Sequence, residues 1–150
     1  MRQLVNALAI LRANAALTSA AANIGTTKPK AGTTATLVFQ IDGVFKSKAS
    51  TDDFWTLAGT TVAASSFQKY LLMVDTSGNA STAQGVQAST AAAVVLPAPP
   101  QSKCIAAVLT IATDASTTFV PGTTDLDASG ITATYSNGFD GSQLKPVVLA

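Results

Sequence analysis

The stretch FQKYLLMVDTSGNASTAQGVQA, residues 67–88, predicts a β-hairpin. It starts with an apolar run containing Tyr, Leu and Val, a composition typical of a buried strand. Asp75, Ser77, Gly78 and Asn79 follow, and these residue types favour turns because Asp and Asn bond the local backbone and Gly adopts left-handed conformations. The residues ASTAQG then form a returning strand. The same turn residues occur in nucleophile loops and calcium loops, so the rest of the chain decides between a site and a corner.

The residue inventory argues against a site at this turn. The chain has no His and no Glu, and its eight acidic residues are all Asp. This excludes Ser-His-Asp and Cys-His catalysis, His-ligated metals and imidazole proton transfer. A calcium loop built on Asp75, Ser77 and Asn79 would lack the bidentate acid that usually closes the cage. We therefore interpret the segment as a hairpin corner.

The two close pairs of acids are Asp52-Asp53 and Asp125/Asp127. Neighbouring aspartates on an extended chain point to opposite sides, so the first pair would not share a substrate without a bend. We interpret it as loop or cap residues, and the second pair as turn residues before Gly130. The sequence thus predicts no catalytic residue, no cofactor and no metal.

Further strand signals follow and precede this hairpin. Residues 35–42 alternate apolar and polar positions with a period of two, and Asp42-Gly43 then predicts a hairpin turn or a strand kink. The segments CIAAVLTIATD and ITATYSN are predicted strands, whereas the prolines between residues 97 and 100 exclude a regular central strand or helix there. The fold class expected is mostly β, a compact antiparallel β-sandwich or small barrel.

An amphipathic helix is predicted to precede the β domain. Leu4, Leu8 and Leu11 are spaced as one face of a helix, which favours an N-terminal helical arm over residues 1–24. The Pro/Gly/Thr-rich residues 25–34 are predicted to be a linker, and residues 35–150 the β domain with a C-terminal tail. The alternative for the first segment is a secretory signal, although Asn6 and Arg12 interrupt its apolar run. No stretch is long and apolar enough to span a membrane.

The composition favours a subunit of an assembly. Hydrophobic residues make up 47% of the chain and charged residues only 11%, and the mean hydropathy is +0.35. An average globular protein carries roughly 25% charged residues. We infer that other protein covers much of the surface, or that Thr and Ser hydroxyls make the surface polar. The net charge of +1 comes with scattered basic residues and no basic stripe, so nucleic-acid binding has little electrostatic support. The single cysteine, Cys104, is expected to be a small core residue.

Phe54 and Trp55 are candidate interface residues. Adjacent side chains on an extended segment cannot both face one core. One of the two is therefore expected to contact a partner chain, since buried aromatic residues anchor many protein interfaces.

Four segments carry a resemblance to a known class of proteins. They are FQIDGVFKSKASTDDFWTLAGTTV, KYLLMVDTSGNASTAQG, LPAPPQSKCIAAVLTI and STTFVPGTTDLDASGITATYSNG. In this order they resemble small virion proteins of tailed bacteriophages, of the head-decoration (cement) or head-fibre-like type. The match covers roughly residues 39–138 and leaves out the N-terminal segment and the last residues.

The resemblance implies a non-enzymatic protein on the exterior of a capsid. Its partners would be the major capsid protein and further copies of itself, in a homo-oligomer with a trimer as one option, and not nucleic acid or a membrane. Such a protein stabilises the head by bridging capsomers through buried area and multivalency. Two alternatives stay open: a tail- or fibre-associated virion protein involved in host attachment, and a secreted carbohydrate-binding β domain that uses Trp55.

Overall fold

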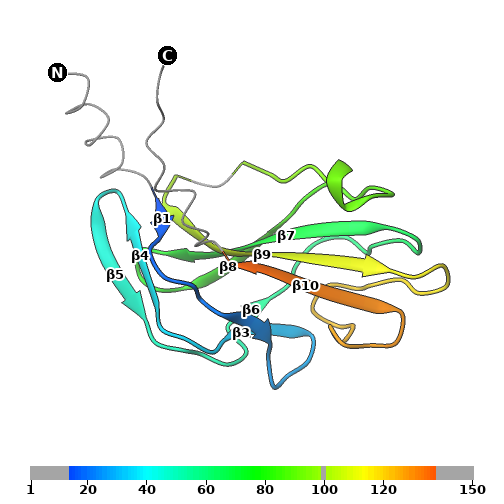
Figure 1. Cartoon of the computed structure of the whole chain (residues 1–150), viewed down its shortest axis with the longest axis horizontal. Coiled ribbons are helices and arrows are strands. Elements are labelled where there is room, and N and C mark those ends of the chain that lie inside the picture. The colour runs from blue at the N-terminus through cyan, green and yellow to red at the C-terminus, as the bar shows by residue number, and fades with distance from the viewer. Residues whose placement is uncertain (1–13, 99–100, 138–150) are drawn as a thin grey trace, which may run out of the picture.

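In the described part of the chain, the regular structure is antiparallel β-structure apart from one 3-10 turn, and the mostly β class that the sequence predicts is confirmed. The computed structural model describes residues 14–98 and 101–137, which form three antiparallel sheets and one 3-10 turn (Figure 1). The strands are β1 (Ala15–Ala16), β2 (Ala22–Ile24), β3 (Lys30–Thr33), β4 (Leu37–Ile41), β5 (Val44–Lys48), β6 (Trp55–Thr56), β7 (Phe67–Asp75), β8 (Ala80–Gln84), β9 (Lys103–Thr113) and β10 (Ile131–Asn137), and the turn is η1 (Ala91–Ala93).

The largest sheet has four strands in the order β10-β9-β7-β8. Its β7–β8 pair is the hairpin predicted from residues 67–88, with Val74 opposite Ala80 beside the turn. The two longest strands, β7 and β9, pair along their length, with a shift of register between Leu72 and Met73. The apolar runs of the sequence therefore lie in the centre of this sheet, where both neighbours satisfy their backbone groups.

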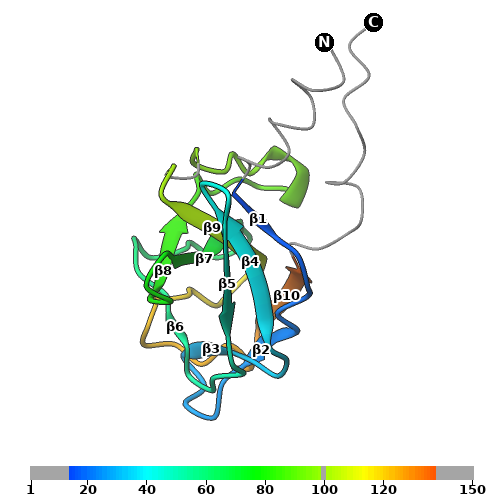
Figure 2. The same cartoon turned by 90° about the vertical axis from the view of Figure 1, so that its left-hand side faces the viewer.

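The two smaller sheets, β1-β4-β5 and β2-β3-β6, share one core with the large sheet. Along β7, Tyr70, Leu72 and Val74 belong to this core, which follows from the period of two in a strand. On β4 the alternate residues Leu37 and Phe39 meet them from the other layer. Figure 2 shows β4 and β5 in front of β7 and β9. The expected sandwich-like packing of antiparallel sheets around one core is confirmed.

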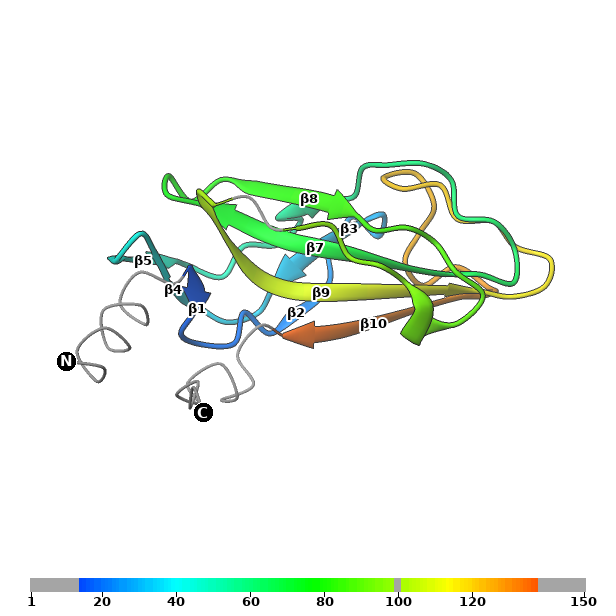
Figure 3. The same cartoon turned by 90° about the horizontal axis from the view of Figure 1, so that it is seen from above.

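The opposite face of β7 is covered as well. Leu71 and Met73 point away from the shared core, yet both are buried. The connection between β8 and β9, which includes η1, crosses this side of the sheet (Figure 3). At Gly85 the connection passes so close that an added Cβ would lie 2.5 Å from the Val95 carbonyl oxygen. Residues 94–98 of this connection form no regular strand, as Pro97 predicts, whereas Pro99 and Pro100 lie outside the described residues.

The predicted helical arm is wrong for its second half. Residues 15–24 contribute β1 and β2, and Ala16, Ala20 and Ala22 are buried in the core. Alanine has a high helix propensity, but sheet pairing with β4 and β3 together with burial outweighs this weak local preference. Leu4, Leu8 and Leu11 lie outside the described residues, so their prediction stays untested.

The predicted linker is also wrong. Residues 25–34 contain β3, which pairs with β2 and β6, so the β domain begins well before residue 35. The Pro and Gly residues that suggested a linker serve the hairpin instead. Gly32 lies inside β3, where an added Cβ would be 3.2 Å from the Cα of Asp52. The small residue permits this close approach of two backbones.

Candidate interaction surface

The β4–β5 hairpin projects at one end of the molecule and forms the candidate surface. Its turn is Asp42-Gly43, and both residues have positive φ, 50° and 80°. These angles fit a type I′ turn, whose twist matches that of the flanking strands. The sequence left open a hairpin turn or a strand kink, and the structure has the hairpin. In the part of the chain that the structure describes, β5 is the outer strand of its sheet and pairs only with β4 (Figure 2).

The side chains of β5 divide between two faces. Residues directly opposite one another in an antiparallel pair project to the same side. On β4, every second side chain enters the core, and each of these residues pairs with a residue of β5. The paired β5 side chains therefore project to the same inward side, but they lie outside the core. These pairs are Ile41 with Val44, Phe39 with Lys46 and Leu37 with Lys48. Where a strand inside the sandwich would carry apolar side chains, β5 carries two lysines.

Two apolar side chains near the turn are open to solvent. Val44 is 53% exposed and Phe45 is 61% exposed. A single exposed apolar residue is ordinary in a globular protein. Here the two neighbours lie on an edge strand, whose outward N–H and C=O groups are themselves able to pair with another chain. The combination gives this hairpin the features of an interface.

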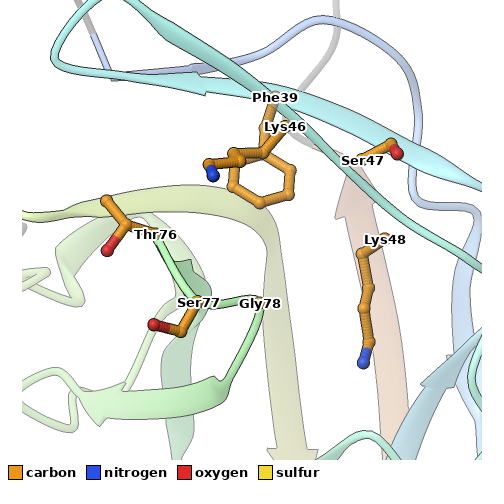
Figure 4. A pocket seen from close by; sticks show the side chains of 7 residues that line it. All are labelled: Phe39, Lys46, Ser47, Lys48, Thr76, Ser77 and Gly78. Atoms are coloured by element: carbon orange, nitrogen blue, oxygen red, sulfur yellow. The ribbon is translucent and has the colours of Figure 1, made fainter.

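A groove of about 370 Å³ lies between the hairpin and the β7–β8 turn (Figure 4). Lys46 and Lys48 project from β5 toward this space. Its floor and far wall come from the β4 and β7–β8 residues Phe39, Thr76, Ser77 and Gly78, and Ser47 completes the lining. A Cβ added to Gly78 would be 3.8 Å from the Lys48 Cδ atom, which shows how closely the lysine stem follows the turn.

The Lys48 ammonium group is held over an aromatic ring. Its Nζ atom is 5.1 Å from the centroid of the Phe54 ring, a cation–π distance. Phe54 in turn packs on Trp55, with ring centroids 4.6 Å apart. In residues 14–98 and 101–137 the ion pair formed is Lys28–Asp127, so neither groove lysine has a carboxylate partner there.

The structure separates the two aromatic candidates for an interface. Trp55 has 0% exposure and its Nε1 donates a hydrogen bond to the Met73 carbonyl, at 2.9 Å. An interface role for Trp55 is therefore wrong, because its side chain is enclosed by its own domain. Phe54 is half-buried and borders the groove through Lys48. The prediction that one of the two contacts a partner stays open for Phe54.

The turn at Asp75 is a corner built around its own carboxylate. Oδ1 of Asp75 accepts hydrogen bonds from the backbone N–H groups of Ser77, at 2.8 Å, and Asn79, at 2.9 Å. Oδ2 accepts from Nδ2 of Asn79 at 3.1 Å, and Gly78 has a φ of 80°. These bonds use the carboxylate locally, as the turn interpretation of DTSGN predicts.

Asp52 and Asp53 support the turn of the β2–β3 hairpin. Asp52 and Asp53 accept hydrogen bonds from the backbone N–H groups of Thr26 and Thr27, at 2.9 and 2.8 Å, and from their hydroxyls. The backbone bends at Asp53, whose φ is 54°, so the carboxylates of both aspartates reach the same turn. Their interpretation as loop or cap residues is confirmed.

Asp127 approaches the same turn from a different loop and forms the ion pair with Lys28. The pair is exposed, so its contribution to stability is small. The sequence predicted a turn role for this residue, but the partner on a distant hairpin was not predictable from local spacing.

These exposed carboxylates predict a loss of stability in acid. Hydrogen bonds lower the pKa of three aspartates below 3.8. The Thr26 hydroxyl donates to Asp52. The backbone N–H of Asn79 donates to Asp75, and the backbone N–H of Ser116 donates to Asp114. A lowered pKa in the folded state contributes stability above the unfolded value, and this contribution is lost as the pH falls through the folded value. We expect the free energy of unfolding, from urea titrations, to decrease as the pH drops below 3.8.

The matched control for this pH dependence is the triple variant D52N/D75N/D114N, which keeps an acceptor oxygen at each position but does not titrate. Its free energy of unfolding should change less over the same acidic range. Parallel curves for the parent and the triple variant would show that these three carboxylates do not set the acid response.

The described residues also bear on metal sites and membrane-spanning helices. No group of three or more His, Cys, Asp or Glu residues is placed to hold a metal ion in the described part of the chain. In residues 14–98 and 101–137, no helix has the length and apolar character needed to cross a membrane. Cys104 is buried, and burial raises the pKa of its thiol to about 12. Its predicted place in the core is confirmed.

The residues of the hairpin surface were not singled out from the sequence. Val44, Phe45, Lys46 and Lys48 follow the Asp-Gly turn, which marks a hairpin but does not say whether its second strand is central or at an edge.

Comparison with models of protein families, with curated proteins and with solved structures finds no match to this chain.

Proposed function

We propose that this chain is a non-enzymatic structural protein of a tailed-phage virion, a decoration or cement subunit on the exterior of the head. The observation that carries the proposal is the β4–β5 hairpin, where β5, the edge strand of its sheet in the described residues, presents Val44 and Phe45 to solvent. The resemblance of residues 39–138 to head-decoration and head-fibre-like proteins supplies the kind of assembly. The low content of charged residues is consistent with a subunit whose surface meets other protein.

The mechanism would be non-covalent bridging of capsomers. Each copy would place the hairpin on the major capsid protein, or on a neighbouring copy of itself, and bury the exposed apolar side chains there. Burial of apolar surface contributes about 25 cal/mol per Å², and many weak copies on one particle add through multivalency. No catalytic step, cofactor or metal enters this mechanism.

Of the two alternative functions, the carbohydrate-binding one loses its premise, and the tail- or fibre-associated one stays open. The carbohydrate-binding alternative assigned sugar contact to Trp55, and this premise is overturned because Trp55 is fully buried. The tail- or fibre-associated alternative uses the same hairpin surface at another position on the virion. Antibody or gold labelling of virions distinguishes it, since label on the tail would contradict a head-decoration role.

The hairpin variant V44S/F45S is expected to reduce binding to phage heads. Truncating two apolar contacts at an interface costs on the order of 1 kcal/mol each, so the affinity should fall by about tenfold or more. The measurement uses heads of the encoding phage prepared without this subunit, incubated with purified protein, and counts bound copies after sedimentation. The midpoint of unfolding should be unchanged because both side chains are largely exposed.

The matched control is V86S/V120S, which removes two exposed valines from other parts of the surface. It should bind as the parent does. Equal occupancy for V44S/F45S and the parent would remove the hairpin from the interface, and failure of the parent to bind heads at all would contradict the decoration role itself.

A further inference from the structure

We infer that β5 and the groove beside it bind an extended acidic segment of a partner protein, which adds to the sheet as a further strand. The occupant is a polypeptide with two carboxylates spaced two residues apart. The inference deepens the proposed function, on which its biological setting rests, by naming the chemistry that the hairpin surface recognises.

The first step is the free edge. In the described residues β5 pairs only with β4, so one side of its backbone is unpaired. In a hairpin with a two-residue turn, the residues beside the turn form a hydrogen-bonded pair and the pattern then alternates. The N–H and C=O groups of Phe45 and Ser47 therefore point outward. These are the groups to which an added strand would bond.

The second step is the charge on the inner face. Lys46 and Lys48 lie on the same side of β5, two positions apart, and both line the groove. Within the described residues neither forms an ion pair. Lys48 is held in place by Phe54, which reduces the side-chain freedom that binding would otherwise remove.

The third step concerns competing carboxylates, and none of the described residues that line the groove carries one. Of the acids nearest in sequence to its lining, Asp75 directs its oxygens into its own turn, toward Ser77 and Asn79. Asp42 lies in the hairpin turn and is not among the lining residues. The hydroxyls of Thr76 and Ser77 border the groove and are able to donate further hydrogen bonds to an anion.

The fourth step is the match of spacing. Side chains on an added strand alternate between the two faces, so residues two apart share one face. Two lysines at this spacing on β5 favour two carboxylates at the same spacing on the partner, an Asp-x-Asp pattern. Val44 shares the face of the two lysines, whereas Phe45 projects from the opposite face of β5. Apolar residues between and around the two acids project to that opposite face, where they would contact Phe45. Two lysines alone make a small footprint for a nucleic-acid backbone, and an unpaired strand edge is suited to a polypeptide.

The test measures binding of a fluorescein-labelled peptide, TVDVDVT, to the full chain by fluorescence anisotropy. A second peptide, TVVDDVT, has the same composition but places its aspartates on opposite faces of a strand. We expect the first to bind more tightly. The variant K46Q/K48Q keeps most of each side-chain stem but lacks both charges. It should bind the first peptide about fivefold more weakly, because the loss corresponds to the combined free energy of two exposed ion pairs.

Two further variants sharpen the result. K30Q/K69Q changes the net charge equally at lysines outside the groove and should bind as the parent does. S47P removes an outward donor from the edge and should also weaken binding, with folding checked by circular dichroism. Equal affinity of the two peptides, or unchanged binding by K46Q/K48Q, would overturn the inference.

A lysine on an edge strand also prevents edge-to-edge pairing between copies. If the parent binds neither peptide and K46Q/K48Q self-associates in analytical ultracentrifugation, the lysines have this protective role and the inference fails. The peptide experiment uses no phage particle. Peptide binding without binding to heads would overturn only the decoration function, and binding to heads without peptide selectivity would overturn only this inference.

Discussion

The substitution W55A is expected to lower the free energy of unfolding by about 3–5 kcal/mol. The Trp55 ring is fully buried between the sheet β2-β3-β6 and the large sheet, so its removal leaves a cavity lined by the core. A domain of this size is stabilised by only about 5–15 kcal/mol in total, so the loss is a large fraction. Urea denaturation followed by circular dichroism measures it, since Trp55 is the single tryptophan and fluorescence is lost with it.

The variant W55F separates the hydrogen bond from the packing. Phenylalanine keeps most of the apolar contact but cannot donate to the Met73 carbonyl, which Trp55 Nε1 reaches at 2.9 Å. Leaving a buried acceptor without this donor costs about 1–3 kcal/mol, less than the full truncation. A W55A protein within about 1 kcal/mol of the parent would contradict the placement of this side chain in the core.

The substitution F119A is expected to cost a similar amount, about 3–5 kcal/mol. Phe119 is fully buried, and its ring lies 6.5 Å from that of Tyr70 in an edge-on arrangement. Its backbone exchanges two hydrogen bonds with Val62, at 2.8 and 3.0 Å, which join two long loops. Loss of the ring should therefore destabilise the domain and, in particular, loosen this junction.

Two readouts test the Phe119 prediction. Urea denaturation gives the change in stability, and hydrogen exchange at the Val62 amide should become faster than in the parent. The variant F119L retains much of the apolar volume and should cost only ~1.5 kcal/mol. V120S alters the next residue, whose side chain is largely outside the core, and should leave stability unchanged. Slow exchange at Val62 in F119A would show that the ring does not hold the loops together.

The candidate surface was harder to predict than the fold, for a physical reason. An Asp-Gly turn with strands around it predicts a hairpin, because the required φ angles are a local property of those two residues. Whether β5 is central or at an edge depends on which other segments pair with it, and those lie far away in the sequence. The groove needs Lys46 and Lys48 beside Thr76 and Ser77, a contact between two separate hairpins.

The sequence by itself determined the β class, the Asp75–Asn79 corner and the lack of any imidazole chemistry, since each follows from local turn preferences, strand periodicity or composition. The tertiary structure alone decided that residues 15–33 contribute the three strands β1, β2 and β3, and that Trp55, not Phe54, is enclosed in the core. These outcomes depend on pairing and burial between distant segments. Alanine-rich and glycine-rich stretches carry no strong local signal against a helix or a linker, so non-local contacts fix their conformation.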